Sequence, residues 1–179
     1  MFTWPLMYDL SSLSVDPQTK LNVGVIGVGN MGKHHARNYS RIPNVTLAAL
    51  CDISSDVLEP FIQQYKCNGY TDLNDMIEQE SLDAVSITAP TKTHYRIAKT
   101  IINNGINLLI EKPICDNVDE AEELIQLAKE KGVVLMVGHI ERFNPAVLKL
   151  KELIEQDTIG KITSIIAKRV GAFPAQIKD

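Results

Sequence analysis

Three glycines at a fixed spacing are the first residues in this sequence whose types suggest a chemistry. They stand in the segment Gly27-Val28-Gly29-Asn30-Met31-Gly32, which follows an apolar run and precedes a stretch of helical periodicity. In a G-x-G-x-x-G turn the first glycine allows a tight turn, the second lets the backbone approach a pyrophosphate, and the third lets helix and strand pack closely. The helix N-terminus adds free N–H groups and a dipole that favours an anion. We therefore predict a dinucleotide site at this turn, with Asn30 and Met31 in it beside the glycines.

An acidic residue follows at the place where such a site uses one. Asp52 comes directly after the next apolar run, Val45 to Cys51. A carboxylate there accepts hydrogen bonds from the adenosine ribose hydroxyls and repels a 2′-phosphate, so NAD is favoured over NADP. Ser54 and Ser55 could accept a 2′-phosphate if Asp52 pointed away. A glycine turn alone often serves ordinary packing, but the strand, the helix and the acidic residue together favour a nucleotide site.

The segments around these residues alternate in a regular way. Short apolar runs typical of buried parallel strands are separated by helix-length stretches with apolar residues every three or four positions. This alternation implies right-handed crossovers, and it predicts an α/β fold with a doubly wound, Rossmann-type parallel sheet. The runs are Leu21 to Gly27, Val45 to Cys51, Ala84 to Thr88, Asn107 to Ile110 and Val133 to Val137. The helical stretches are Met31 to Ser40, Ser55 to Tyr65, Asp72 to Gln79, Lys92 to Asn104 and Val118 to Lys131.

The predicted organisation has three parts. Residues 1–20 lack periodicity and are interpreted as an arm, and residues 21–140 form the dinucleotide-binding domain. Residues 141–179 hold a linking helix, Pro145 to Gln156, and a strand, Lys161 to Val170, which would open a second α+β domain. Because one strand has nothing to pair with, we expect the chain to stop just inside that domain and the strand to be mobile or to pair with another chain.

The composition excludes several classes of protein. The chain has 179 residues, 45% of them hydrophobic, and a formal net charge of −4. No cluster of lysines and arginines offers the stripe that a nucleic-acid backbone needs, and no run approaches the roughly 18 apolar residues of a membrane span. We expect a soluble, folded protein without nucleic-acid or membrane partners.

The cysteines and histidines do not indicate a metal site. Cys51, Cys67 and Cys115 are widely spaced and lack the C-x-x-C or Cys/His pairing of metal ligands, so they are interpreted as free thiols of a cytoplasmic protein. The neighbours His34 and His35 point to different sides of a helix and cannot chelate one ion together. Both are interpreted as structural or close to a phosphate.

From Leu21 to Asp179 the sequence resembles the N-terminal half of the glucose-fructose oxidoreductase, inositol dehydrogenase and MocA-like family of oxidoreductases. The likeness rests on VGVIGVGNMGKHHARNY around the glycine turn, on Thr88-Ala89-Pro90 with His94 after it, and above all on Glu111-Lys112-Pro113. It implies an NAD-dependent sugar dehydrogenase. The cofactor-binding residues that it implies beyond the glycine turn are Thr88, Ala89, Pro90, His94, Glu111 and Lys112.

The lysine of the Glu-Lys-Pro tripeptide carries the catalytic prediction. In the family it lies beside the nicotinamide and the substrate and assists proton transfer as an alcohol becomes a ketone, and Lys112 takes that role by resemblance. The role is chemically reasonable, because a hydride leaves a secondary alcohol only as the hydroxyl proton departs. A surface lysine in a loop is the alternative, but the position at a strand end, where doubly wound sheets bind ligands, favours a function.

A narrower resemblance covers VGHIERFNPAV, from Val137 to Val147, followed by KRVG and FP near the chain end. It is similar to the branch that includes UDP-N-acetylglucosamine 3-dehydrogenases, which oxidise the C3 hydroxyl of the sugar to a ketone. It implies a UDP-N-acetylhexosamine substrate bound by Lys112, His139, Arg142 and Asn144. Arg142 as an ion-pair residue at a helix start, and His139 as a packing histidine, remain alternatives.

Three readings of the function stay open: a nucleotide-sugar dehydrogenase, a dehydrogenase of inositol or another free polyol, and a dinucleotide-binding module without chemistry. Members of the family continue with an open antiparallel sheet that covers the active site, supplies a catalytic aspartate and histidine, and forms the oligomer interface. None of this follows Asp179. We therefore expect a truncated chain with little turnover of its own, and a homo-oligomer when the protein is full length.

Overall fold

The computed structural model describes residues 19–168 and residue 170. Nearly all of the predicted arm, residues 1–20, and part of the predicted last strand lie outside the described residues. The chain divides into two compact units, Met1–His139 and Ile140–Asp179. The glycine turn and the Glu-Lys-Pro tripeptide both belong to the first unit.

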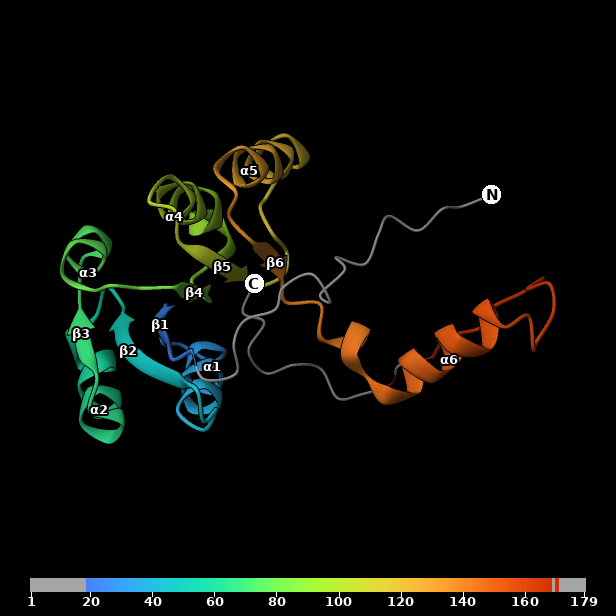
Figure 1. The fold of residues 1–179 in the computed structure, drawn as a ribbon, viewed down its shortest axis with the longest axis horizontal. Helices are drawn as coiled ribbons and strands as arrows, with labels where there is room; N and C mark the ends of the chain where they lie inside the picture. The colour runs from blue at the N-terminus through green and yellow to red at the C-terminus, as the bar shows by residue number, and fades with distance from the viewer. Residues whose placement is uncertain (1–18, 169, 171–179) are drawn as a thin grey trace. The chain divides into compact units, whose positions relative to one another are not determined.

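The first unit contains a parallel sheet of six strands. In chain order they are β1 (Leu21–Ile26), β2 (Val45–Cys51), β3 (Asn68–Tyr70), β4 (Ala84–Ile87), β5 (Asn107–Ile110) and β6 (Leu135–Val137). Their order across the sheet is β3-β2-β1-β4-β5-β6, so the chain starts in the middle, moves to one edge, and then crosses to the other side of β1 (Figure 1). This reversal between β1 and β4 is the switch point of a doubly wound sheet, beside which ligands bind at the carboxyl ends of the strands. The predicted fold class is confirmed.

Helices cover both faces of this sheet. Figure 1 shows α1 (Gly32–Tyr39) and α2 (Ser55–Tyr65) on one face, and α3 (Leu73–Gln79), α4 (Thr91–Asn103) and α5 (Val118–Lys131) on the other. Successive residues of a strand point to opposite faces, so both faces of a central strand must be apolar. In β1, Val25 packs into the layer of α1 and α2, while its neighbour Ile26 packs into the layer of the other three helices.

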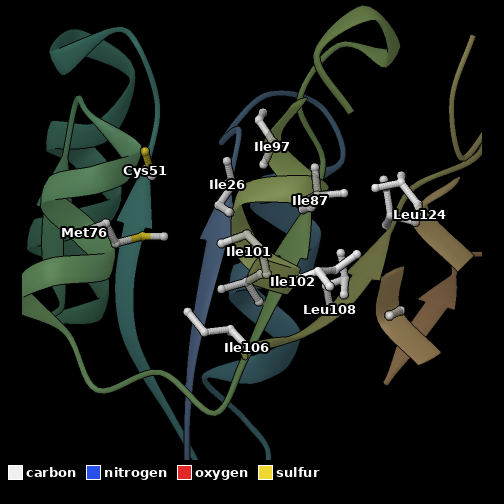
Figure 2. Close-up of a cluster of buried hydrophobic side chains, with 14 of the residues drawn as sticks. Ile26, Cys51, Met76, Ile87, Ile97, Ile101, Ile102, Ile106, Leu108 and Leu124 are labelled. Atoms are coloured by element: carbon white, nitrogen blue, oxygen red, sulfur yellow. The ribbon is translucent and has the colours of Figure 1, made fainter. Parts of the chain in front are cut away.

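The larger cluster of buried side chains lies beneath α3, α4 and α5. Helix α4 carries apolar residues at helical spacing, and Ile101 and Ile102 are fully buried with Met76 of α3 and Leu124 of α5 (Figure 2). Burying an aliphatic side chain of this size contributes about 1.5–3 kcal/mol. The cluster therefore holds β4 and β5 rigidly, and these two strands carry the Thr-Ala-Pro and Glu-Lys-Pro segments at their carboxyl ends.

Most element boundaries agree with the sequence prediction to within a residue. β6 is shorter than the predicted run, which began at Val133. The amide of Val133 instead donates to the carbonyl of Ala128 and so belongs to the C-terminal end of α5. That end is formed at Gly132, whose φ is 66°. The three-residue strand β3 was not predicted. It is a short edge strand, paired in parallel with β2 alone, and it has no apolar periodicity.

The second unit has a 3-10 helix, η2 (Ile140–Phe143), and the helix α6 (Pro145–Glu155), which was predicted. The predicted strand from Lys161 to Val170 is wrong for the described residues, because residues 162–168 form no strand. A strand exists through its hydrogen bonds to a neighbour, and an alternating pattern alone does not supply that neighbour. No residue of η2 or α6 is buried.

No helix in the described part of the chain is both long enough and apolar enough to span a membrane.

Candidate functional site

The glycine loop joins β1 to α1 and is shaped by contacts that exclude larger side chains. Gly27 has a φ of 86°, and a Cβ on it would lie 2.6 Å from the amide nitrogen of Ala89. A Cβ on Gly32 would overlap the carbonyl oxygen of Gly27. The Thr88 hydroxyl, at the end of β4, donates to that same carbonyl. Gly27 and Gly32 are therefore required by the tight turn and by the close contact of α1 with the strands.

Gly29 has different surroundings from the other two glycines. Its φ is not in the left-handed region, and a Cβ on it would meet nothing within 4 Å. The protein's own packing therefore gives no reason for a glycine here. Gly29, Asn30 and Met31 are all exposed at the tip of the loop, in front of the start of α1. An open backbone at a helix N-terminus fits the close approach of a pyrophosphate.

The starts of the helices around the switch point share a property. α1, α2 and α4 follow the neighbouring strands β1, β2 and β4, and none of the three has a side-chain hydrogen bond at its N-cap. By contrast, α3, α5 and α6 are capped by their own residues, Asp72, Asn117 and Asn144. The first N–H groups of a helix lack partners within the helix and attract anions. The site predicted for a dinucleotide is therefore also the place where the helix starts are left uncapped.

Asp52, directly after β2, points toward the glycine loop. Its Oδ2 accepts the amide of Val28 at 2.8 Å, and its Oδ1 accepts the amide of Ser54 at 3.1 Å. Ser54 and Ser55 were expected to accept a 2′-phosphate only if Asp52 pointed away from the loop. Asp52 points toward the loop, so that condition is not met. Each carboxylate oxygen has a further lone pair, so the group can still accept a hydroxyl proton. Its place beside the loop fits the predicted contact with a ribose.

Lys112 is exposed at the carboxyl end of β5, on the sheet edge that also carries the glycine loop. The residue before it, Glu111, is 8% exposed and keeps its backbone in the sheet through a bond to the Ile87 carbonyl. Its side chain accepts the amide of Lys112 at 3.2 Å and the Nε2 atom of His35 lies 3.2 Å from it. The Glu111 carboxylate thus makes its hydrogen bonds within the protein, to His35 and to the Lys112 amide. Its contact with a cofactor remains a prediction.

His94 in α4 is buried, with 1% of its surface exposed. Its Nδ1 lies 3.0 Å from the carbonyl oxygen of Pro113, and its Nε2 lies 2.8 Å from that of Ala89. The ring therefore connects the loop after β4 to the loop after β5. Direct contact of His94 with a cofactor stays a prediction, and the structure adds that its ring contacts the backbone of two loops of the site.

The remaining predicted residues lie at the surface. Pro90 is exposed at the start of α4, and His139 is exposed after β6. Arg142 and Asn144 belong to the second unit, in η2 and at the start of α6. The Asn144 side chain accepts the amide of Ala146 and so caps α6. The substrate contacts predicted for His139, Arg142 and Asn144 remain predictions.

Two residues near the site were not expected from the sequence. Ser86 is a buried polar residue in β4, and its hydroxyl lies 2.6 Å from the Tyr39 hydroxyl and 3.0 Å from Nδ1 of His35. Burial raises the pKa of Tyr39 above its ordinary value, and the bond to Ser86 opposes that rise in part. A serine inside an apolar strand was the available sequence signal, since buried hydroxyls need partners.

Comparison with known proteins agrees with this geometry. The family described as "Oxidoreductase family, NAD-binding Rossmann fold" matches residues 21–139. A UDP-N-acetylglucosamine 3-dehydrogenase of Acidithiobacillus ferrooxidans is 35% identical over 159 residues, which cover 89% of this chain and 48% of that protein. The chain belongs to the glucose-fructose oxidoreductase, inositol dehydrogenase and MocA family. The predicted resemblance and its NAD cofactor are confirmed, and the matched stretch contains the glycine loop, Asp52 and Lys112.

Other members of the family act on polyols. A myo-inositol 2-dehydrogenase of Thermotoga maritima is 32% identical over 142 residues, which cover 79% of this chain and 42% of that protein. The crystal structure of scyllo-inositol dehydrogenase from Lactobacillus casei with bound NAD(H) and scyllo-inositol superposes with a TM-score of 0.77 at 26% identity, over 81% of this chain and 44% of that one. This chain spans about half the length of the relatives that it matches.

No group of three or more His, Cys, Asp or Glu side chains that could hold a metal ion occurs among the residues that the structure describes.

Proposed function

We propose that this chain is the cofactor-binding half of an NAD-dependent dehydrogenase that oxidises a secondary hydroxyl of a sugar to a ketone. The observation that carries the proposal is the placement of Lys112 and the open Gly29 backbone on one edge of the sheet, at the ends of strands near the switch point. NAD, when bound, supplies the hydride acceptor. The residues of this chain then hold the dinucleotide and orient the alcohol.

Each residue has a definite part in this proposal. The amides at the start of α1 hold the pyrophosphate, and Asp52 accepts the ribose hydroxyls. Lys112 orients the substrate hydroxyl through a hydrogen bond and accepts the hydroxyl proton on its unprotonated Nζ as the C–H bond breaks. His139, Arg142 and Asn144 contribute contacts to the sugar.

For the substrate we propose the C3 hydroxyl of a UDP-N-acetylhexosamine. The support is the identity to the Acidithiobacillus enzyme, whose match extends over 159 residues and thus beyond the family's stretch at residues 21–139. A free polyol such as inositol is the second candidate, supported by the Thermotoga enzyme and the Lactobacillus structure.

Calorimetric titration with NAD and, separately, NADP tests the cofactor site. We expect NAD to bind at least about tenfold more tightly, because Asp52 repels a 2′-phosphate. Gly29→Val should abolish binding without unfolding the chain, because its side chain fills the space that the pyrophosphate needs. If neither dinucleotide binds to the unaltered chain, the proposal is wrong for this chain.

Lys112→Ala separates an enzyme from a binding module. The variant should bind NAD with unchanged affinity and should lose reduction of NAD in the presence of UDP-N-acetylglucosamine or myo-inositol, whichever substrate the parent oxidises. Lys131→Ala is the matched control, since Lys131 is equally an exposed lysine but lies at the C-terminal end of α5. A Lys112→Ala variant that keeps the turnover of the parent would favour the module.

A further inference from the structure

A continuous set of side-chain contacts runs from α1 to the segment that carries Lys112. The Tyr39 hydroxyl meets the Ser86 hydroxyl at 2.6 Å, and Ser86 meets Nδ1 of His35 at 3.0 Å. Nε2 of His35 then meets Oε1 of Glu111 at 3.2 Å, and Oε2 of Glu111 accepts the Lys112 amide at 3.2 Å. The His35 and Glu111 side chains are 14% and 10% exposed, so water has little access to the contact between them. The contacts join α1, β4 and the end of β5.

The hydrogen-bonding capacity of these groups determines which atom is the donor in each hydrogen bond. The Glu111 carboxylate accepts from both sides, so Nε2 of His35 must be the donor to it. In a neutral ring Nδ1 is then an acceptor, which receives the Ser86 proton, and Ser86 in turn accepts the proton of Tyr39. Every donor in this arrangement has one acceptor.

A doubly protonated ring would not fit as well. Nδ1 would then donate to Ser86, and the hydroxyl protons of Ser86 and Tyr39 would share one remaining hydrogen bond, so one of the two protons would have no acceptor within this set of contacts. A polar hydrogen left without a partner at a partly buried position is unfavourable.

We propose that His35 is a positioning residue for Lys112, which it holds in place through Glu111 with a neutral ring that carries its proton on Nε2. The proposal rests on the proposed function, since Lys112 matters only if it serves the substrate. His35 lies in the first helix after the glycine loop. The contacts therefore connect the segment that carries the proposed catalytic lysine to α1, the helix whose start holds the pyrophosphate in the proposed function.

The tautomer of His35 can be measured without any cofactor. In a long-range proton–nitrogen correlation spectrum of the unaltered chain near neutral pH, we expect the His35 ring to show a protonated Nε2 and an unprotonated Nδ1. His34, the exposed neighbour in the same helix, serves as the internal reference. A His35 ring protonated on Nδ1, or on both nitrogens, would overturn the proposal.

The second measurement is the hydrogen-exchange rate of the Lys112 amide in two variants of His35. His35→Gln places an N–H donor where Nε2 stands and should keep the rate near that of the parent. The shorter side chain of His35→Asn reaches only the position of Nδ1, so it cannot donate a hydrogen bond to Glu111. In this variant the Lys112 amide should exchange at least about tenfold faster than in the parent. His34→Asn is the matched control and should leave the rate unchanged.

Equal rates in His35→Gln and His35→Asn would overturn the proposal, because generic loss of the imidazole would then explain both variants. If His35→Asn does not fold, the tautomer in the unaltered chain still decides. Neither measurement needs NAD, so failure of the positioning role is distinguishable from failure of the proposed function, which appears as absent NAD binding in calorimetry.

Discussion

Gly29 and Gly32 stand three positions apart in one loop and meet different surroundings, so their substitutions should have separable effects. A Cβ on Gly32 would overlap the Gly27 carbonyl and lie 2.8 Å from the Thr88 hydroxyl, whereas one on Gly29 would meet nothing within 4 Å. We expect Gly32→Ala to lower the free energy of unfolding by about 1–3 kcal/mol, as overpacking does. Gly29→Ala should leave it within about 0.5 kcal/mol.

Urea unfolding of both variants, together with NAD titration, checks this prediction. Gly29→Ala should weaken NAD binding in a chain of unchanged stability. Equal destabilisation by the two substitutions would mean that Gly29 is also a packing glycine, and the argument for an open approach to the loop would be lost.

At this scale the sequence could predict the residues whose roles depend on local chain geometry. The three glycines and Asp52 are singled out by their places at the ends of apolar runs, whereas the role predicted for Lys112 comes from the resemblance of its Glu-Lys-Pro tripeptide to the family. The place of Ser86 in an apolar strand signals a buried hydroxyl that needs a partner, but its partners Tyr39 and His35 could not be predicted, because they lie on another element. His35 is 51 positions from Ser86 and 76 from Glu111, and no local periodicity reports such a pairing.

Among the elements, α2 contains an unfavourable residue in its interior. Pro60 is exposed in the middle of Ser55–Tyr65. A proline there has no N–H for the helix and its ring crowds the carbonyl four residues earlier, at a cost of roughly 3 kcal/mol, part of which is offset by the stiffer unfolded chain. Pro60→Ala should therefore raise the free energy of unfolding by about 1–2 kcal/mol, measured by urea unfolding.

Pro43→Ala is the matched control for Pro60. Pro43 is an exposed proline in the turn before β2, where its fixed φ suits the chain. Its replacement should lower stability by up to about 1 kcal/mol or leave it unchanged. A Pro60→Ala variant that gains no more than Pro43→Ala would contradict the assignment of Pro60 to a regular helical turn.

The elements that the sequence predicted well are those buried on both faces or along one helical stripe. β2, β5, α2 and α5 have the predicted boundaries. β3 was missed because a three-residue edge strand is defined by its pairing with β2 and not by an apolar pattern. The predicted strand from Lys161 to Val170 shows the opposite error, since its alternation is clear but residues 162–168 form no strand.

For the molecule as a whole, stability should fall at alkaline pH. Burial raises the pKa of Cys51 from 9.0 to about 12 and that of Cys115 to about 11, with nearby carboxylates adding to both shifts. A hydrogen bond to Glu80 and burial raise the pKa of Tyr70 to about 12. While the folded chain keeps these protons, the unfolded chain loses the Tyr70 proton above pH 10.0 and the two thiol protons already above pH 9.0. The stabilisation is complete below that pH and is lost as pH rises toward 12.

Equilibrium unfolding in urea at several values between about pH 8 and about pH 10.5 measures this slope. Cys51→Ala should lower the stability near neutral pH, because it leaves a small cavity, but should flatten the dependence on pH by removing one proton from the difference between the two states. A slope in Cys51→Ala identical to that of the parent would show that this thiol titrates alike in both states.

The distribution of buried side chains also indicates which part of the molecule contributes most to its stability. Every buried hydrophobic residue among those described lies between Val23 and Ala128, within the first unit, and α6 and η2 bury none. Hydrophobic burial is the dominant favourable term in folding, so a chain that ends after His139 should keep its fold.

We expect the urea midpoint of this shortened chain to shift by less than about 10% and its affinity for NAD to change less than about twofold, since the glycine loop, Asp52 and Lys112 are all retained. A large loss of stability in the shortened chain would mean that Ile140–Asp179 contributes burial to the first unit, and the exposed leucines and isoleucines of α6 would then be the first residues to substitute.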